Sequence, residues 1–158
     1  MRFLVLILIL VPLQAFGQSN TGLQAGAAVR VITPNPLLPI SGGVGVPKDV
    51  KEKKGELYVR ALVLQEGETK VAIVNIDNLG WPAALGDRSR ALIKGIPAEN
   101  ILIGATHTHS GPDAYAFPDE NGKTRADLAY LDWCVKEVAA AGNVRVRQAV
   151  ADNPITTF

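Results

Sequence analysis

Histidine and cysteine are scarce in this sequence: its 158 residues include two histidines and one cysteine. A single cysteine excludes a disulfide within the chain. The formal net charge is +1 at pH 7, so the sequence has neither the basic excess of a nucleic-acid-binding protein nor an acidic tail, and we expect no nucleic-acid partner. Chemistry based on imidazole or thiol side chains must therefore involve His107, His109 or Cys134.

After its first twenty residues, the sequence also lacks an apolar run of the roughly 20 residues that span a bilayer. The first residues are apolar from Phe3 to Val11, and small residues follow at Ala15 and Gly17. This order is typical of a signal peptide, which we expect to comprise residues 1–17. An uncleaved anchor is the alternative, but a proline interrupts the stretch. We expect a secreted or periplasmic protein with no transmembrane segment after cleavage.

What is abundant is apolar material: 47% of the residues are hydrophobic and 20% are charged, which is enough for one packed core. Cys134 lies in a segment of helical spacing, about residues 125–141, in which Leu131, Val135 and Val138 fall on the same side. We therefore expect Cys134 to be buried on a helix face, which makes it a weak candidate for a metal ligand or a nucleophile.

Several segments have the composition of β-strands. A short strand is expected at residues 27–32, before a Thr-Pro pair that disfavours helix. The runs LYVRALVL, residues 57–64, and KVAIVNI, residues 70–76, are separated by QEGET, which predicts a hairpin turn around Gly67.

A helix is expected at residues 83–94 because its apolar residues recur at helical spacing, and a buried strand is expected at residues 101–105. Strand, helix and strand normally form a right-handed crossover, which makes the strands at 70–76 and 101–105 parallel. The expected fold class is α/β: a mixed β-sheet with a β-hairpin and a βαβ crossover, with helices packed on the sheet, in an incomplete domain.

The segment LPISGGVGVP, residues 38–47, is expected to be a loop. Its glycines at positions 42, 43 and 45 permit close approaches that a side chain would block. The Lys-Ser/Thr pair of a phosphate-binding loop does not follow, so the glycines alone do not indicate a phosphate site.

Both histidines lie in ATHTHSGPD, residues 105–113, directly after the last predicted strand. If the backbone stays extended there, His107 and His109 share a side and can converge on one zinc ion. Alternatively, one histidine binds metal while the other contacts substrate or moves a proton. A polar surface loop is the remaining reading. Asp77 ends the neighbouring parallel strand and is expected at the same sheet edge.

Three other hydrolase patterns fit less well. A metallo-β-lactamase-like site would have an Asp-His pair where this chain has Gly111 and Pro112, and the preceding hairpin argues against the first strand of an amidohydrolase barrel. Ser110 is not surrounded by the Gly-X-Ser-X-Gly pattern of a nucleophile elbow.

The segment THTHSGPD after ILIGA, preceded by VRALVL, VAIVNID and IPAENILI, resembles the N-terminal part of the neutral/alkaline, non-lysosomal ceramidase family. The segments AGAAVRVITP and ISGGVG resemble the beginning of that family's catalytic domain as well. The resemblance covers roughly residues 23–141, and Thr-His-Thr-His-Ser-Gly-Pro is its most specific part.

The resemblance implies a secreted or surface zinc amidase that cleaves the N-acyl bond of ceramide, a lipid-like amide, to sphingosine and a fatty acid. By position, His107 would be a ligand of Zn²⁺ and His109 a catalytic residue near the amide. We consider Asp77, from geometry alone, either a partner of the metal ligand or a strand-end cap.

The sequence departs from the family pattern in two respects. Val31 stands where family members commonly have Asp. The family's other ligands (a histidine, a glutamate and a tyrosine) and its serine nucleophile would lie beyond residue 158, and residues 142–158 do not follow the pattern. We expect residues 18–158 to be the N-terminal portion of such a domain, from a truncated or frame-shifted product. The alternative is an exported, non-enzymatic binding or structural module; the oligomeric state stays open.

Overall fold

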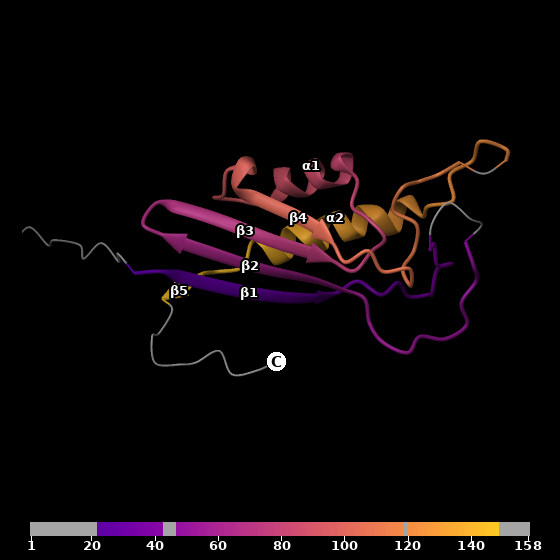
Figure 1. Ribbon diagram of the computed structural model, residues 1–158, viewed down its shortest axis with the longest axis horizontal. Coiled ribbons are helices and arrows are strands. Elements are labelled where there is room, and N and C mark those ends of the chain that lie inside the picture. The colour runs from indigo at the N-terminus through magenta and orange to yellow at the C-terminus, as the bar shows by residue number, and fades with distance from the viewer. Residues whose placement is uncertain (1–21, 43–46, 119, 149–158) are drawn as a thin grey trace, which may run out of the picture.

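The computed structural model describes residues 22–42, 47–118 and 120–148, and the expected signal peptide lies outside them. Figure 1 shows a sheet with strand order β4-β3-β2-β1-β5, with α2 lying across it. The elements are β1 (Gln24–Val31), β2 (Tyr58–Glu66), β3 (Thr69–Ile76), α1 (Ala83–Leu92), the 3₁₀ helix η1 (Ala98–Asn100), β4 (Ile101–Ala105), α2 (Leu128–Gly142) and β5 (Arg147–Gln148).

The predicted hairpin is confirmed. β2 and β3 pair antiparallel from Val59–Ile76 to Glu66–Thr69, and Gly67 adopts a left-handed φ of 55° in the turn between them. Glycine meets that requirement without steric cost. β1 pairs antiparallel with the other side of β2 and begins three residues earlier than predicted, at Gln24.

The predicted crossover is also confirmed. β3 and β4 pair parallel, from Ala72 opposite Ile101 to Ile76 opposite Ala105. The helix between them, α1, ends at Leu92, two residues before its predicted end. The fold is therefore the expected mixed α/β sheet, and the parallel strands end at a common edge.

Helix α2 covers the middle of the sheet and begins at Leu128, three residues after its predicted start. It starts there because the carboxylate of Asp127 accepts a hydrogen bond from the backbone N–H of Tyr130, the usual arrangement of an N-cap. Cys134 is fully buried on this helix, as predicted, and burial raises the pKa of its thiol to about 12. Within the described residues, no helix is both long and apolar enough to span a membrane.

The two faces of the sheet differ. The side chains facing the helices are buried, among them Val59, Val63, Val74 and Ile76. On the other side, which we call the open face, five large apolar residues of the strands are 41 to 63% exposed: Val29, Val31, Leu62, Ile73 and Leu102. Leu62 pairs with Ile73, and Ile73 pairs with Leu102, so these side chains form a continuous apolar row across β2, β3 and β4.

Candidate functional site

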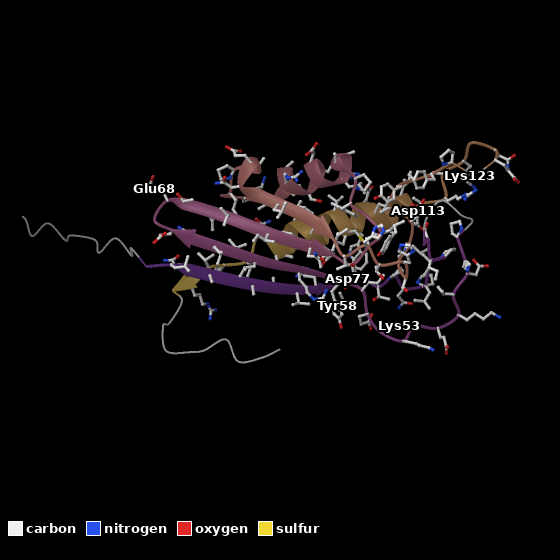
Figure 2. All side chains as sticks on the ribbon, in the orientation of Figure 1. Lys53, Tyr58, Glu68, Asp77, Asp113 and Lys123 are labelled. Atoms are coloured by element: carbon white, nitrogen blue, oxygen red, sulfur yellow. The ribbon has the colours of Figure 1, made fainter. Side chains whose placement is uncertain are left out.

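The candidate site lies at the edge where β3 and β4 end. The backbone N–H of Thr106 donates to the carbonyl of Ile76 at 3.0 Å, which continues the parallel pairing one step into the loop that follows β4. Figure 2 shows Asp77 and Asp113 at this end of the sheet, opposite the hairpin turn that carries Glu68. The histidine loop, residues 106–113, therefore begins beside the end of β3.

The structure brings His107 and His109 together, but not through an extended backbone. His107 has a left-handed φ of 61°, so the prediction of an extended chain after β4 is wrong at this residue. The turn instead places the two imidazole rings edge to face, with centroids 5.1 Å apart. A left-handed conformation is uncommon for a residue with a side chain, and such residues often lie at functional sites.

A hydrogen bond accounts for the orientation of His107. Its ring nitrogen Nδ1 lies 2.7 Å from the backbone carbonyl oxygen of Leu79, in the loop after β3. Leu79 was not identified from the sequence, because a backbone carbonyl has no residue-type signature. The bond joins the loops that follow the two parallel strands.

The loop that carries Leu79 is fixed by hydrogen bonds of the preceding residue, Asn78. Asn78 is fully buried, its Oδ1 accepts from the N–H of Leu79 at 2.7 Å, and its own N–H donates to Ile76 at 3.0 Å. The Asn78 Nδ2 atom has no hydrogen-bond partner among the described residues. A buried asparagine side chain that bonds to the adjacent backbone fixes the turn into which β3 leads.

His109 packs against the glycine loop predicted at residues 38–47. A Cβ atom added to Gly42 would lie 3.3 Å from Nδ1 of His109. The N–H of Ser41 donates to the carbonyl of Gly111 at 2.8 Å, which ties this loop to the histidine loop. The close approach expected of these glycines is confirmed at position 42, while Gly43 and Gly45 lie outside the described residues.

Asp77 bonds to β2. Its Oδ2 accepts from the N–H of Tyr58 at 2.9 Å and from the guanidinium of Arg60 at 3.0 Å. Arg60 also lies over the ring of Tyr58, 4.5 Å from its centroid. These contacts are those of a strand-end cap; the ring nitrogen of His107 bonds to Leu79 instead.

Two further polar residues of the histidine loop stabilise the loop itself. Asp113 is 4% exposed, and its Oδ1 accepts from the N–H of Tyr115 at 2.9 Å. The N–H of Ser110 donates to Thr108 Oγ1 at 3.3 Å, and the Ser110 side chain is exposed. Cys134 lies in the core of α2 and takes no part in this edge.

A pocket of about 660 Å³ opens beside the histidine loop. Thr106, Thr108 and Ser110 contribute polar groups to its wall. Much of the apolar part of the wall comes from the first residues of the glycine loop and from the segments that flank the loop: Leu37, Leu38, Ile40, Val50 and Leu57. Glu56 also lines it, and hydrogen bonds with Lys53 and Thr33 lower the pKa of its carboxyl group.

The side chains present can supply part of a metal site. Neutral imidazoles are zinc ligands, and a catalytic zinc ion is normally held by three protein ligands and a water molecule. Over residues 22–42, 47–118 and 120–148, no three His, Cys, Asp or Glu side chains cluster in a way that could hold a metal ion. His107 and His109 are the two imidazole side chains that lie at this edge.

No protein-family profile and no curated protein matches the chain. Among solved structures, it is similar to neutral ceramidase from Pseudomonas aeruginosa and to ceramidase complexed with C2, each with a TM-score of 0.63 and 18% sequence identity. Each match covers 82% of this chain and 22% of the solved chain, so this chain spans about a fifth of the length of those proteins. The similarity shows a shared fold.

Proposed function

We propose that this chain is the N-terminal portion of a zinc-dependent amidohydrolase of the neutral ceramidase type, which hydrolyses the N-acyl amide of ceramide to sphingosine and a fatty acid. The observation that carries the proposal is the pair His107 and His109, whose ring centroids are 5.1 Å apart. The pair lies at the common end of parallel strands, in a fold similar to that of neutral ceramidase. Open α/β sheets commonly bind ligands at this edge.

In this proposal, the two histidines have different roles. His107 binds zinc through Nε2, because its Nδ1 already bonds to Leu79. His109, packed against Gly42 at the edge of the loop, contacts the amide of the substrate. A bound zinc ion would lower the pKa of a water molecule to about 7 and polarise the amide carbonyl.

The pocket beside the histidine loop supports a lipid-like substrate. Its wall is apolar around Leu37, Ile40 and Leu57, and it reaches polar groups at Thr106 and Ser110. Ligand pockets commonly combine apolar walls with a few polar groups that fix the orientation of the ligand. An acyl or sphingoid chain along the apolar wall would bring an amide near the histidine loop.

The number of donors limits the expected activity. A catalytic zinc ion needs about three protein ligands, and we assign His107 alone as a metal ligand in this chain. We therefore expect weak zinc binding and little or no hydrolysis by the 158-residue chain. The other ligands would come from polypeptide beyond this sequence.

Zinc affinity tests the proposal and separates it from the alternative, an exported binding or structural module. Purified chain is titrated with zinc by calorimetry, beside His107→Ala and His109→Ala. We expect roughly a tenfold or greater loss of zinc affinity in His107→Ala, because it removes a metal ligand. His109→Ala removes only a neighbour of the metal and should lose less affinity. Equal, negligible binding in all three would favour the alternative.

A fluorescent N-acyl-sphingosine assay with added zinc tests the expected activity of the chain alone. Turnover that depends on zinc and disappears in His107→Ala would support the zinc amidase and contradict the expectation of low activity. Zinc binding without turnover is the expected result.

A further inference from the structure

We infer that the Asn78–Leu79 turn positions His107: its backbone carbonyl at Leu79 selects the Nδ1–H tautomer of the ring, so that Nε2 is the nitrogen with a free lone pair. The Nδ1 atom lies 2.7 Å from that carbonyl oxygen, a normal hydrogen-bond length. A carbonyl oxygen can only accept, so Nδ1 must carry the proton.

The selected tautomer differs from the usual one. A free histidine side chain favours the proton on Nε2, which would leave Nδ1 to accept, and two acceptors cannot share a hydrogen bond. In neutral His107, the Leu79 carbonyl therefore favours the form whose Nε2 can bind a metal.

The carbonyl can act in this way because its position is fixed. Leu79 is 6% exposed and Asn78 is fully buried. The side chain of Asn78 binds the N–H of Leu79, and the N–H groups of both Asn78 and Thr106 donate to Ile76. The turn after β3 and the first residue after β4 are thus anchored on one carbonyl, which sets the distance from Leu79 to His107.

The relevance of this tautomer to zinc binding rests on the proposed function. Metal-binding histidines commonly donate their other ring N–H to a carbonyl or carboxylate, which fixes the ring and the tautomer. The carboxylate of Asp77 bonds to Tyr58 and Arg60. The backbone of Leu79 takes the positioning role that we had considered for Asp77.

Long-range ¹H–¹⁵N correlation spectra of the zinc-free, ¹⁵N-labelled chain at pH 8 test the inference. The ring of His107, assigned through the His107→Ala spectrum, should show a protonated Nδ1 and an unprotonated Nε2. His109 is the internal comparison, because no ring nitrogen of it is hydrogen-bonded within the described residues. A His107 ring with its proton mainly on Nε2 would overturn the inference.

Asn78→Ala tests the role of the turn. Loss of the bond to the Leu79 N–H should move His107 toward a mixture of tautomers. Asn100→Ala is the matched control, because it removes a side-chain bond to the backbone of Lys70 near the start of β4, at the opposite end of that strand, and should leave the tautomer unchanged. A folded Asn78→Ala protein with an unchanged tautomer ratio would contradict this role.

If Asn78→Ala does not fold, the wild-type spectrum still decides the tautomer. The zinc titration is independent of it: an Nδ1–H tautomer in a chain that binds no zinc would contradict the proposed function and leave the positioning of His107 intact. Zinc binding by a chain with the Nε2–H tautomer would contradict the positioning of His107 by Leu79 and leave the proposed function intact.

Discussion

Gly42 lies against the imidazole of His109, so closely that a Cβ at Gly42 would be 3.3 Å from Nδ1. Gly42→Ala should therefore displace the His109 ring by a few tenths of an ångström and shift its side-chain resonances, while those of His107 change less. Gly55→Ala is the matched control, because a Cβ there would meet nothing within 4 Å. Unchanged His109 resonances in Gly42→Ala would show that the glycine loop does not contact this ring in solution.

Most of the fold could be predicted because it depends on local patterns. The β-rich runs on either side of Gly67 define the hairpin, and the connection of β3 to β4 through a helix predicts their parallel pairing, which the structure has. The ends of the helices were less predictable: α2 starts where Asp127 caps it, and the periodicity of its apolar residues did not show this.

The candidate site was predictable only in part. Parallel strands with adjacent ends bring Asp77 and the histidine loop to one edge, and this followed from topology. The left-handed backbone at His107 and the bond to Leu79 did not, since both depend on how two loops pack. A backbone carbonyl contributes to a site without leaving a sequence signal.

Asp77 should contribute to stability through its bonds to β2. Asp77→Ala removes the acceptor for the N–H of Tyr58 and the ion-pair partner of Arg60. We expect the free energy of unfolding in urea to fall by about 1–2 kcal/mol. Asp77→Asn can keep one acceptor and should lose less.

Asp87→Ala is the control for this measurement. Asp87 forms an exposed i,i+3 pair with Arg90 on α1, with 75% of its side chain exposed. Its removal should change the free energy of unfolding by less than about 0.5 kcal/mol. A loss in Asp77→Ala as small as that in Asp87→Ala would show that the cap on β2 is not stabilising.

Cys134 should resist alkylation and make stability sensitive to alkaline pH. Burial raises the pKa of its thiol from 9.0 to about 12, so little thiolate forms in the folded chain at pH 8, and iodoacetamide should react slowly unless urea is added. As the pH rises through about 9, the thiol ionises in the unfolded chain before it ionises in the folded chain. The contribution of the thiol to the free energy of unfolding is therefore fully present below pH 9 and is lost between pH 9 and about pH 12.

Urea unfolding at pH 8 and pH 10 measures this effect. The free energy of unfolding should fall by about 1 kcal/mol more in the wild-type chain than in Cys134→Ala, which has no thiol to ionise. Comparing the change with pH, and not the absolute stability, removes the cost of the smaller side chain in the core. Equal losses in both proteins, or rapid alkylation of the native thiol, would contradict the burial of Cys134.

The open face should make the chain self-associate or bind apolar dyes. Val29, Leu62, Ile73 and Leu102 are exposed over adjacent strands, and the pair β3 and β4 is parallel, a type of pairing that proteins usually cover on both faces. Contiguous exposed apolar surface is unusual in a monomeric soluble protein and promotes association.

Leu102→Lys places a charge at the most exposed position of this row, where the side chain is 63% exposed, so it should leave folding intact while reducing association. We expect sedimentation velocity to show less of any oligomer, and the fluorescence of a bound apolar dye to fall several-fold. Leu92→Lys is the control, because Leu92 is 43% exposed on α1, on the side of the sheet covered by helices. Equal effects of the two substitutions would show that association depends on net charge and not on the open face.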